Sequence, residues 1–380
     1  MKRKEFIKNM ASATAALALM HKAPALGAIN MTVPDQTPGA NSKMKLAISA
    51  FSYEKEFNEG KHFEEIVEDM ADIGAAGIEI LGETHIPDYP NPSQAWVEQW
   101  YIMLQNFNLK PVAYDLFVDT KFYKNRLLTT KEALQLLIRD FRLANKLGLK
   151  IIRQQVAPYP ADNPADSYLA PYVKSKPSME LLEMAIPYAE ENGVIMAVEL
   201  HSPTRLKSPW IDSCLELIEK TKTKNLGFCP DLSSFVYTPP RSNVEAILAQ
   251  GARKEIVDFI ISAYQKQLGF EKTMEEVAKM GGNEVEKRYA SAGGIYHFSY
   301  NDPKDLKIIA PYIYHVHAKF FGMEDNLTEY SIPYPEIIKS LRDIGYQGYL
   351  STEFENYAWI PASPQIRLQH AMLRGLLAKQ

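Results

Sequence analysis

The chain has 380 residues, of which 46% are hydrophobic and 23% are charged, a composition typical of a globular protein. Its formal net charge is −4, and no basic cluster occurs beyond the first eight residues, so the sequence lacks the electrostatic footprint of a nucleic-acid-binding protein. The two cysteines, Cys214 and Cys229, are expected to be buried thiols and not a disulfide.

The first 28 residues have the order of a secretory signal. Basic residues come first, an apolar stretch covers 10–20, and small residues follow at 23–28. The apolar stretch is too short to span a bilayer as a mature helix. We therefore expect a signal peptide over 1–28, a flexible lead-in over 29–43 and an exported, periplasmic protein. Export would use the Sec route or an imperfect twin-arginine signal with Lys4 in place of the second arginine; an amphipathic cytoplasmic N-terminus is the alternative.

From residue 45 onward, segments of strand composition alternate with segments that have the apolar spacing of helices. The predicted strands cover 45–53, 77–83, 110–119, 150–156, 193–201, 226–235, 312–321 and 349–355. The predicted helices between and after them cover 62–74, 93–108, 129–147, 177–192, 209–223, 334–344 and 364–378. This alternation predicts an α/β fold, a (β/α)8 TIM barrel over 44–380. The alternative, an open doubly wound sheet, would want a glycine-rich phosphate turn after the first strand, and the sequence has none there.

The alternation of strands and helices stops between the sixth and seventh predicted strands. Residues 236–310 have no obvious strand but contain helical patterns over 243–267 and 273–288. We interpret 236–310 as a helical insertion over the catalytic face, because connections of that length within a domain are usually lids or binding elements.

Four of the predicted strands carry a charged or imidazole side chain at the point where the apolar run gives out: Glu199, Asp231, His317 and Glu353. Barrel enzymes place their sites at the carboxyl ends of the strands. Burying an unpaired carboxylate costs several kcal/mol, so four such endings in series indicate convergence on a shared cation. Each of the four residues could also have a simpler structural role. The two glutamates could pair with buried basic residues, Asp231 could cap the following turn, and His317 could be a hydrogen-bonded core histidine.

Three carboxylates and one imidazole form a hard, mostly oxygen ligand set. Such a set favours one divalent ion, Mn²⁺ above Mg²⁺, Co²⁺ or Zn²⁺. Strand alternation places His315 on the same face as His317 but one layer deeper, where a core role is the simpler expectation. Further residues could line the substrate pocket: Glu79, Gln155, His201, Ser234 and Lys319.

Several segments taken together resemble the xylose isomerase-like barrels, the sugar phosphate isomerases and epimerases. The matching segments are ADIGAAGIEI at 71–80, AVELH at 197–201, GFCPD at 227–231, HVHAK at 315–319 and GYQGYLSTEFE at 345–355. The resemblance implies that Glu199, Asp231, His317 and Glu353 bind one divalent metal. It further implies that Glu199 and Glu353 exchange the substrate proton, as in the epimerases of the family. Where the family often has a histidine three residues after the metal-binding aspartate, this chain has Ser234.

These residues predict an isomerase or epimerase that removes a proton next to the carbonyl of a sugar or keto-sugar and forms an enediolate. A lyase or hydratase acting on a 3-keto-glycoside would use the same intermediate, and the sequence does not separate the two. Aromatic residues Tyr357 and Trp359 beside the site suit a neutral sugar ring. A non-catalytic sugar-binding protein is a further alternative, and the chain could form a homo-oligomer. A metal-dependent nuclease on the same barrel is disfavoured, because it would need more histidine ligands and a basic face.

Overall fold

The computed structural model describes residues 44–117, 128–155 and 176–378, and the predicted signal peptide and lead-in fall outside these ranges. The eight strands are β1 (Lys45–Ser49), β2 (Gly77–Leu81), β3 (Lys110–Phe117), β4 (Ile151–Gln155), β5 (Ile195–Leu200), β6 (Leu226–Pro230), β7 (Val316–Phe320) and β8 (Tyr349–Phe354). They pair in parallel in the order β6-β5-β4-β3-β2-β1-β8-β7. The fold is a (β/α)8 barrel, and the predicted fold class is confirmed.

The ring closes between β6 and β7 by short bridges at Phe228–Ile313 and Asp231–His317. A β-carbon at Gly227 would lie 2.3 Å from the carbonyl oxygen of Tyr312, so only glycine lets the chain before β7 approach β6 this closely. The second bridge sets Asp231 directly beside His317. The closure of the barrel therefore also brings two of the predicted ligands together.

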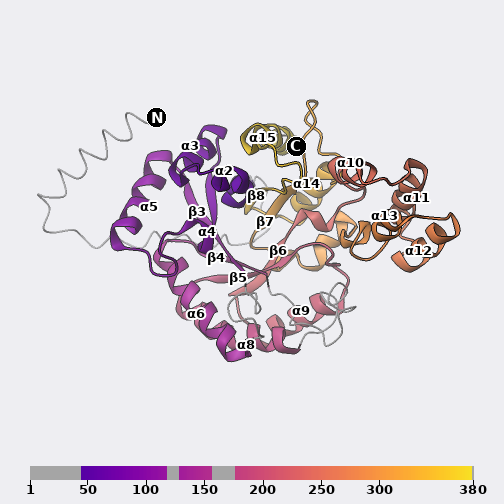
Figure 1. Ribbon diagram of the computed structural model, residues 1–380. Helices are drawn as coiled ribbons and strands as arrows, with labels where there is room; N and C mark the ends of the chain where they lie inside the picture. Colours follow the sequence, from indigo (N-terminus) through magenta and orange to yellow (C-terminus); the bar gives the residue numbers. More distant parts are fainter. Residues whose placement is uncertain (1–43, 118–127, 156–175, 379–380) are drawn as a thin grey trace, which may run out of the picture.

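The main outer helices are α3 (Phe63–Ile73), α5 (Gln94–Phe107), α6 (Thr130–Lys146), α8 (Lys176–Glu191), α9 (Pro209–Thr221), α14 (Tyr334–Asp343) and α15 (Ala362–Ala378). They lie around the strands and bury their apolar faces against them (Figure 1). Helix α6 begins with a capping box in which Thr129 and Glu132 each bond the other's backbone N–H. Both cysteines are buried and free, as predicted, and burial raises the pKa of each thiol to about 12.

Four helices lie between β6 and β7: α10 (Arg241–Ala249), α11 (Lys254–Gln265), α12 (Phe270–Lys279) and α13 (Glu284–Tyr289). The two predicted helical patterns are each divided, because Gly251 and Gly281 have positive φ and end a helix. These helices lie to one side of the barrel (Figure 1). The chain after them returns at Ser299 and Asn301, which hydrogen-bond to the loops after β5 and β6.

Several strands are shorter than predicted, and β1, β6 and β7 differ most. Strand β1 ends at Ser49, and a 3₁₀ helix (Ala50–Tyr53) follows it. Strand β6 ends at Pro230, and a short 3₁₀ helix (Leu232–Ser234) follows Asp231. Strand β7 begins only at Val316, because Ala310–Tyr312 also forms a 3₁₀ turn. No described helix is long and apolar enough to cross a membrane.

Candidate metal centre

The structure brings the four predicted metal ligands together. Glu199 lies on β5, Asp231 follows β6, His317 lies on β7 and Glu353 on β8. One ligand atom from each lies within 4.8 Å of the others, and all four residues are 9% exposed or less. The parallel register of neighbouring strands accounts for this convergence at one end of the barrel.

Nδ1 of His317 faces three carboxylates. It lies 2.9 Å from Oε1 of Glu199, 2.8 Å from Oε2 of Glu353 and 3.8 Å from Oδ2 of Asp231. One N–H can satisfy only one of these acceptors. Oδ2 of Asp231 and Oε2 of Glu353 are buried and have no hydrogen-bond partner. This excess of inward-facing oxygens fits a divalent cation held by three oxygens and one nitrogen.

Asp231 serves two purposes at once. Its Oδ1 accepts a hydrogen bond of 2.7 Å from the backbone N–H of Ser233 and so caps the short 3₁₀ helix. Its Oδ2 points to the cluster. The cap and the candidate ligand were alternatives in the sequence, and the structure accommodates both.

The ligand carboxylates are held ionised. Burial alone raises the pKa of Glu199, but Arg153 and His317 bring its pKa down to about 2. Burial likewise raises the pKa of Asp231 and of Glu353, and Lys319 then lowers both below their usual range. Burial lowers the pKa of His317, but the acidic groups around it, Cys229, Glu79 and Glu353 among them, raise its pKa well above the ordinary value. A cation would replace the proton on Nδ1.

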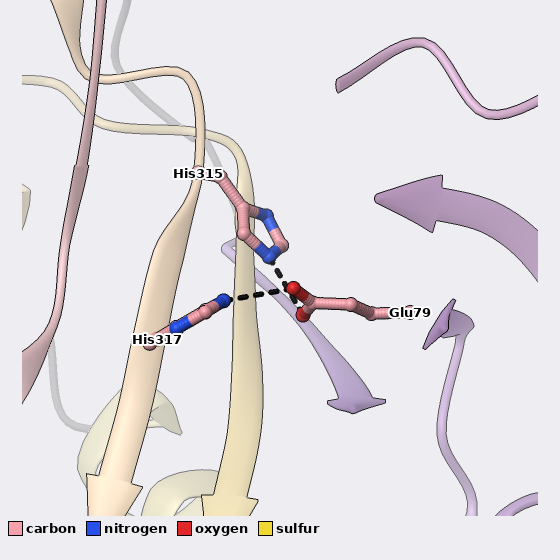
Figure 2. A group of neighbouring side chains, drawn as sticks. All are labelled: Glu79, His315 and His317. Carbon is pink, nitrogen blue, oxygen red and sulfur yellow. Dashed lines mark hydrogen bonds and ion pairs between the residues drawn. The ribbon is translucent and has the colours of Figure 1, made fainter. Parts of the chain in front are cut away.

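On the Nε2 side of His317, the side chains form a second cluster, which is fully buried (Figure 2). Glu79 on β2 accepts hydrogen bonds from Nε2 of His317 at 2.8 Å and Nε2 of His315 at 2.9 Å. The hydroxyl of Ser351 also donates to it. Glu79, His315 and Ser351 are all 0% exposed. Glu79 therefore lies below the centre and not on the substrate pocket, where the sequence had placed it.

Arg153 on β4 is a residue that sequence reasoning missed. Its Nε donates to Oδ1 of Asp115 at 2.8 Å, and its Nη1 lies 3.4 Å from Oε2 of Glu199. Burial and Glu79 raise the pKa of Asp115, against the lowering effect of Arg153. A charged residue within the apolar run KIIRQQV was the available signal.

Lys319 on β7 pairs with the two carboxylate ligands that Arg153 does not contact. Its Nζ is 3.4 Å from Oδ2 of Asp231, 3.2 Å from Oε1 of Glu353 and 2.9 Å from Oε2 of Glu355. The ammonium also lies 5.5 Å from the centre of the Phe51 ring. Lys319 is 2% exposed, and the three carboxylates keep it protonated despite burial.

The remaining predicted pocket residues are less central. His201 is half-buried, its Nδ1 lies 2.6 Å from the carbonyl oxygen of Ser202, and it is close enough to lower the pKa of Glu199. The hydroxyl of Ser234 donates to the carbonyl oxygen of Leu200, so it fastens the loop and does not face the cluster. The side chain of Gln155 lies outside the described residues. Tyr357 and Trp359 are 51% and 47% exposed, and Tyr357 stacks on Phe321 with ring centres 5.7 Å apart.

Comparison with known proteins agrees with this geometry. Residues 67–376 match the model of the xylose isomerase-like TIM barrel family. The chain belongs to this family. It is 25% identical to the 3'-dehydrocarminate deglycosidase alpha subunit of a Microbacterium species, over 88% of this chain and 96% of that protein. It is also 25% identical to a C-glycoside deglycosidase alpha subunit of Arthrobacter globiformis, over 88% of this chain and 93% of the relative.

The fold has solved counterparts. A sugar phosphate isomerase/epimerase from Parabacteroides distasonis superposes with a TM-score of 0.50 at 14% identity and covers 92% of this chain and 99% of its own. The prediction that the chain is an enzyme of this barrel family is confirmed.

Proposed function

We propose that the protein is a divalent-metal-dependent lyase that releases the aglycone from a 3-oxo-glycoside through an enediolate. The arrangement of three carboxylates around Nδ1 of His317 carries the proposal, because it fits a cation and places carboxylates beside it. The names of two relatives favour elimination over isomerisation, since both are deglycosidases and one acts on a 3'-dehydro compound. Epimerisation of a keto-sugar is the second candidate, because the same residues could return the proton they remove.

Glu199, Asp231, His317 and Glu353 would hold the ion, with Mn²⁺ as the first choice for so oxygen-rich a set. When bound, the ion supplies a Lewis acid that polarises the C3 carbonyl and its neighbouring hydroxyl and acidifies the C2–H bond between them.

The base is Glu353 on β8, which pairs with β7, or Glu199 on β5, which lies beyond β6 on the other side. We take Glu353 as the first choice, because Arg153 and His317 bring the pKa of Glu199 down to about 2 against the effect of burial, which makes Glu199 a weak base. The base takes the C2 proton, and the C–H electron pair forms the C2=C3 bond of the enediolate. The C3 carbonyl then re-forms, the pair moves to make the C1=C2 bond, and the aglycone leaves C1 with its bonding electrons and takes a proton from the protonated base or from water. Lys319 remains protonated beside this carboxylate and stabilises the developing negative charge.

The test is an aryl 3-oxo-glucoside incubated with Mn²⁺-loaded protein in deuterated water. Elimination predicts release of the aglycone; deuterium at C2 without release would indicate an epimerase, and neither would indicate a binding protein. Glu353→Gln should lower the rate about 10²–10⁴-fold, with a smaller loss for Glu199→Gln. Undiminished turnover in both variants would overturn the assignment of the base.

Two further proposals concern the setting of the protein. Export to the periplasm is supported by the basic–apolar–small order of residues 1–28 and is tested by fractionation of cells that express the full chain.

Both relatives are named as alpha subunits, so we propose that the chain works in an oligomer with a second subunit; a homo-oligomer is the simpler alternative. Light scattering of the purified chain, alone and with co-expressed neighbouring gene products, separates these states.

A further inference from the structure

We infer that Glu79 is a positioning residue for the metal centre: it fixes the tautomer and the orientation of His317, so that Nδ1 presents its lone pair to the ion. This role rests on the metal-dependent function proposed above. Nothing in the ligand set itself determines which ring nitrogen of His317 carries the proton.

The contact between Glu79 and His317 is direct and isolated from water. Oε1 of Glu79 lies 2.8 Å from Nε2 of His317, and both side chains are 0% exposed (Figure 2). The next carboxylate oxygen, Oδ1 of Asp115, is 3.9 Å from Nε2, beyond hydrogen-bond distance. Glu79 is therefore the acceptor that Nε2 uses.

A neutral imidazole carries one proton, on either nitrogen. If the proton sat on Nδ1, the lone pair of Nε2 would face a buried carboxylate and Nδ1–H would face the ion. With the proton on Nε2, the hydrogen bond to Glu79 is made and the Nδ1 lone pair is free to coordinate. A carboxylate behind a ligating histidine commonly fixes both its tautomer and its ring orientation.

The carboxylate of Glu79 is itself held in place. Its Oε2 accepts from Nε2 of His315 at 2.9 Å and from the hydroxyl of Ser351. His315 immediately precedes β7, Ser351 lies on β8, and both side chains are buried. Three donors on two oxygens prevent rotation of the carboxylate, so the plane of the His317 ring is set as well. Strand β2 supplies no ligand to the candidate ion but determines how β7 presents one.

The deciding experiment measures Mn²⁺ affinity by chelator competition for the wild type, Glu79→Gln and Glu355→Gln. Glu79→Gln keeps the shape of the side chain and should weaken binding about 10–100-fold. Glu355→Gln removes a carboxylate that pairs with Lys319 on the rim and does not contact His317, so it controls for loss of local negative charge. We expect less than about a fivefold loss there.

A second measurement does not depend on the folding of a variant. In the Zn²⁺-loaded wild type labelled with ¹⁵N-histidine, His317 should carry its proton on Nε2 and coordinate through Nδ1. A proton on Nδ1, an unchanged affinity in Glu79→Gln, or an equal loss in both variants would overturn the role of Glu79 while leaving the metal centre intact. A wild type that binds no divalent metal would overturn the metal centre itself, and this role with it.

Discussion

The two sides of the His317 ring differ in their hydrogen-bond balance. On the Nδ1 side, three carboxylates share one ring nitrogen, and two of their buried oxygens have no hydrogen bond. On the Nε2 side, three donors meet the two oxygens of Glu79. Both groups have the residue types and spacing of a metal site. The difference teaches that an excess of unsatisfied acceptors, and not mere clustering of ligand-type residues, marks the side where a cation belongs.

Arg153 connects the two sides, and its loss should have the largest effect. Arg153→Met would leave Asp115 and Glu199 buried without their shared cation, at a cost of about 3–5 kcal/mol in the free energy of unfolding. Urea denaturation of the metal-free protein measures this cost. The double variant with Asp115→Leu should recover part of the loss, because the buried carboxyl that has lost its hydrogen bond from Arg153 is then absent. If Arg153→Met is as stable as the wild type, the pairs that Arg153 forms with Asp115 and Glu199 do not stabilise the fold.

The next largest effect is expected on the Nδ1 side. Asp231→Asn keeps the oxygen that caps Ser233 but removes the charge that faces His317. Metal affinity should fall by more than about a hundredfold, beyond the range typical of changes behind a ligand. Elemental analysis of the dialysed protein gives the metal content per chain, and circular dichroism checks that the fold is retained. Full metal content in the variant would remove Asp231 from the ligand set.

The sequence was most informative for the ligands and least for what lies behind them. Glu199, Asp231, His317 and Glu353 could be predicted because each ends an apolar run in a fold whose strand ends meet. The direction in which the side chains of Glu79 and Arg153 point could not be predicted. Parallel barrel strands are buried on both faces, so their sequences are hydrophobic throughout and do not alternate in a way that tells inward from outward positions. His85 is only 5% exposed, because its ring stacks on Phe63 and meets Phe57 edge-on, both from separate segments. Such pairings across the chain leave no local signature.

The pH dependence of metal binding sharpens the comparison further. Burial lowers the pKa of His317, but the ionisable groups around it raise this pKa well above its usual value, so we expect the metal-free protein to hold protons on both ring nitrogens at neutral pH. Protonated His317 stabilises the metal-free fold fully below about pH 6.5, and this stability is lost as the pH rises through the folded pKa. A metal must displace the Nδ1 proton, whereas Glu199, with a pKa of about 2, releases none.

Affinity should therefore fall about tenfold for each unit by which the pH is lowered between 8 and 6. Isothermal titration in buffers of different ionisation enthalpy should detect one proton released per ion bound. A metal affinity that does not change with pH would mean that Nδ1 carries no proton in the metal-free protein. The carboxylates around Nδ1 would then raise the pKa of His317 less than their distances imply.

The smallest effect is expected from Ser351→Ala. This change removes one of the three donors to Glu79 but leaves the hydrogen bonds from both histidines. The free energy of unfolding should fall by about 1 kcal/mol, the usual net worth of one hydrogen bond, and metal affinity should change less than in Glu79→Gln. The two variants together test whether metal affinity depends on the carboxylate of Glu79 alone or also on the full set of donors that hold it. An affinity loss in Ser351→Ala as large as in Glu79→Gln would mean that the orientation of the carboxylate, and not its hydrogen bond to His317 alone, limits how the ring meets the ion.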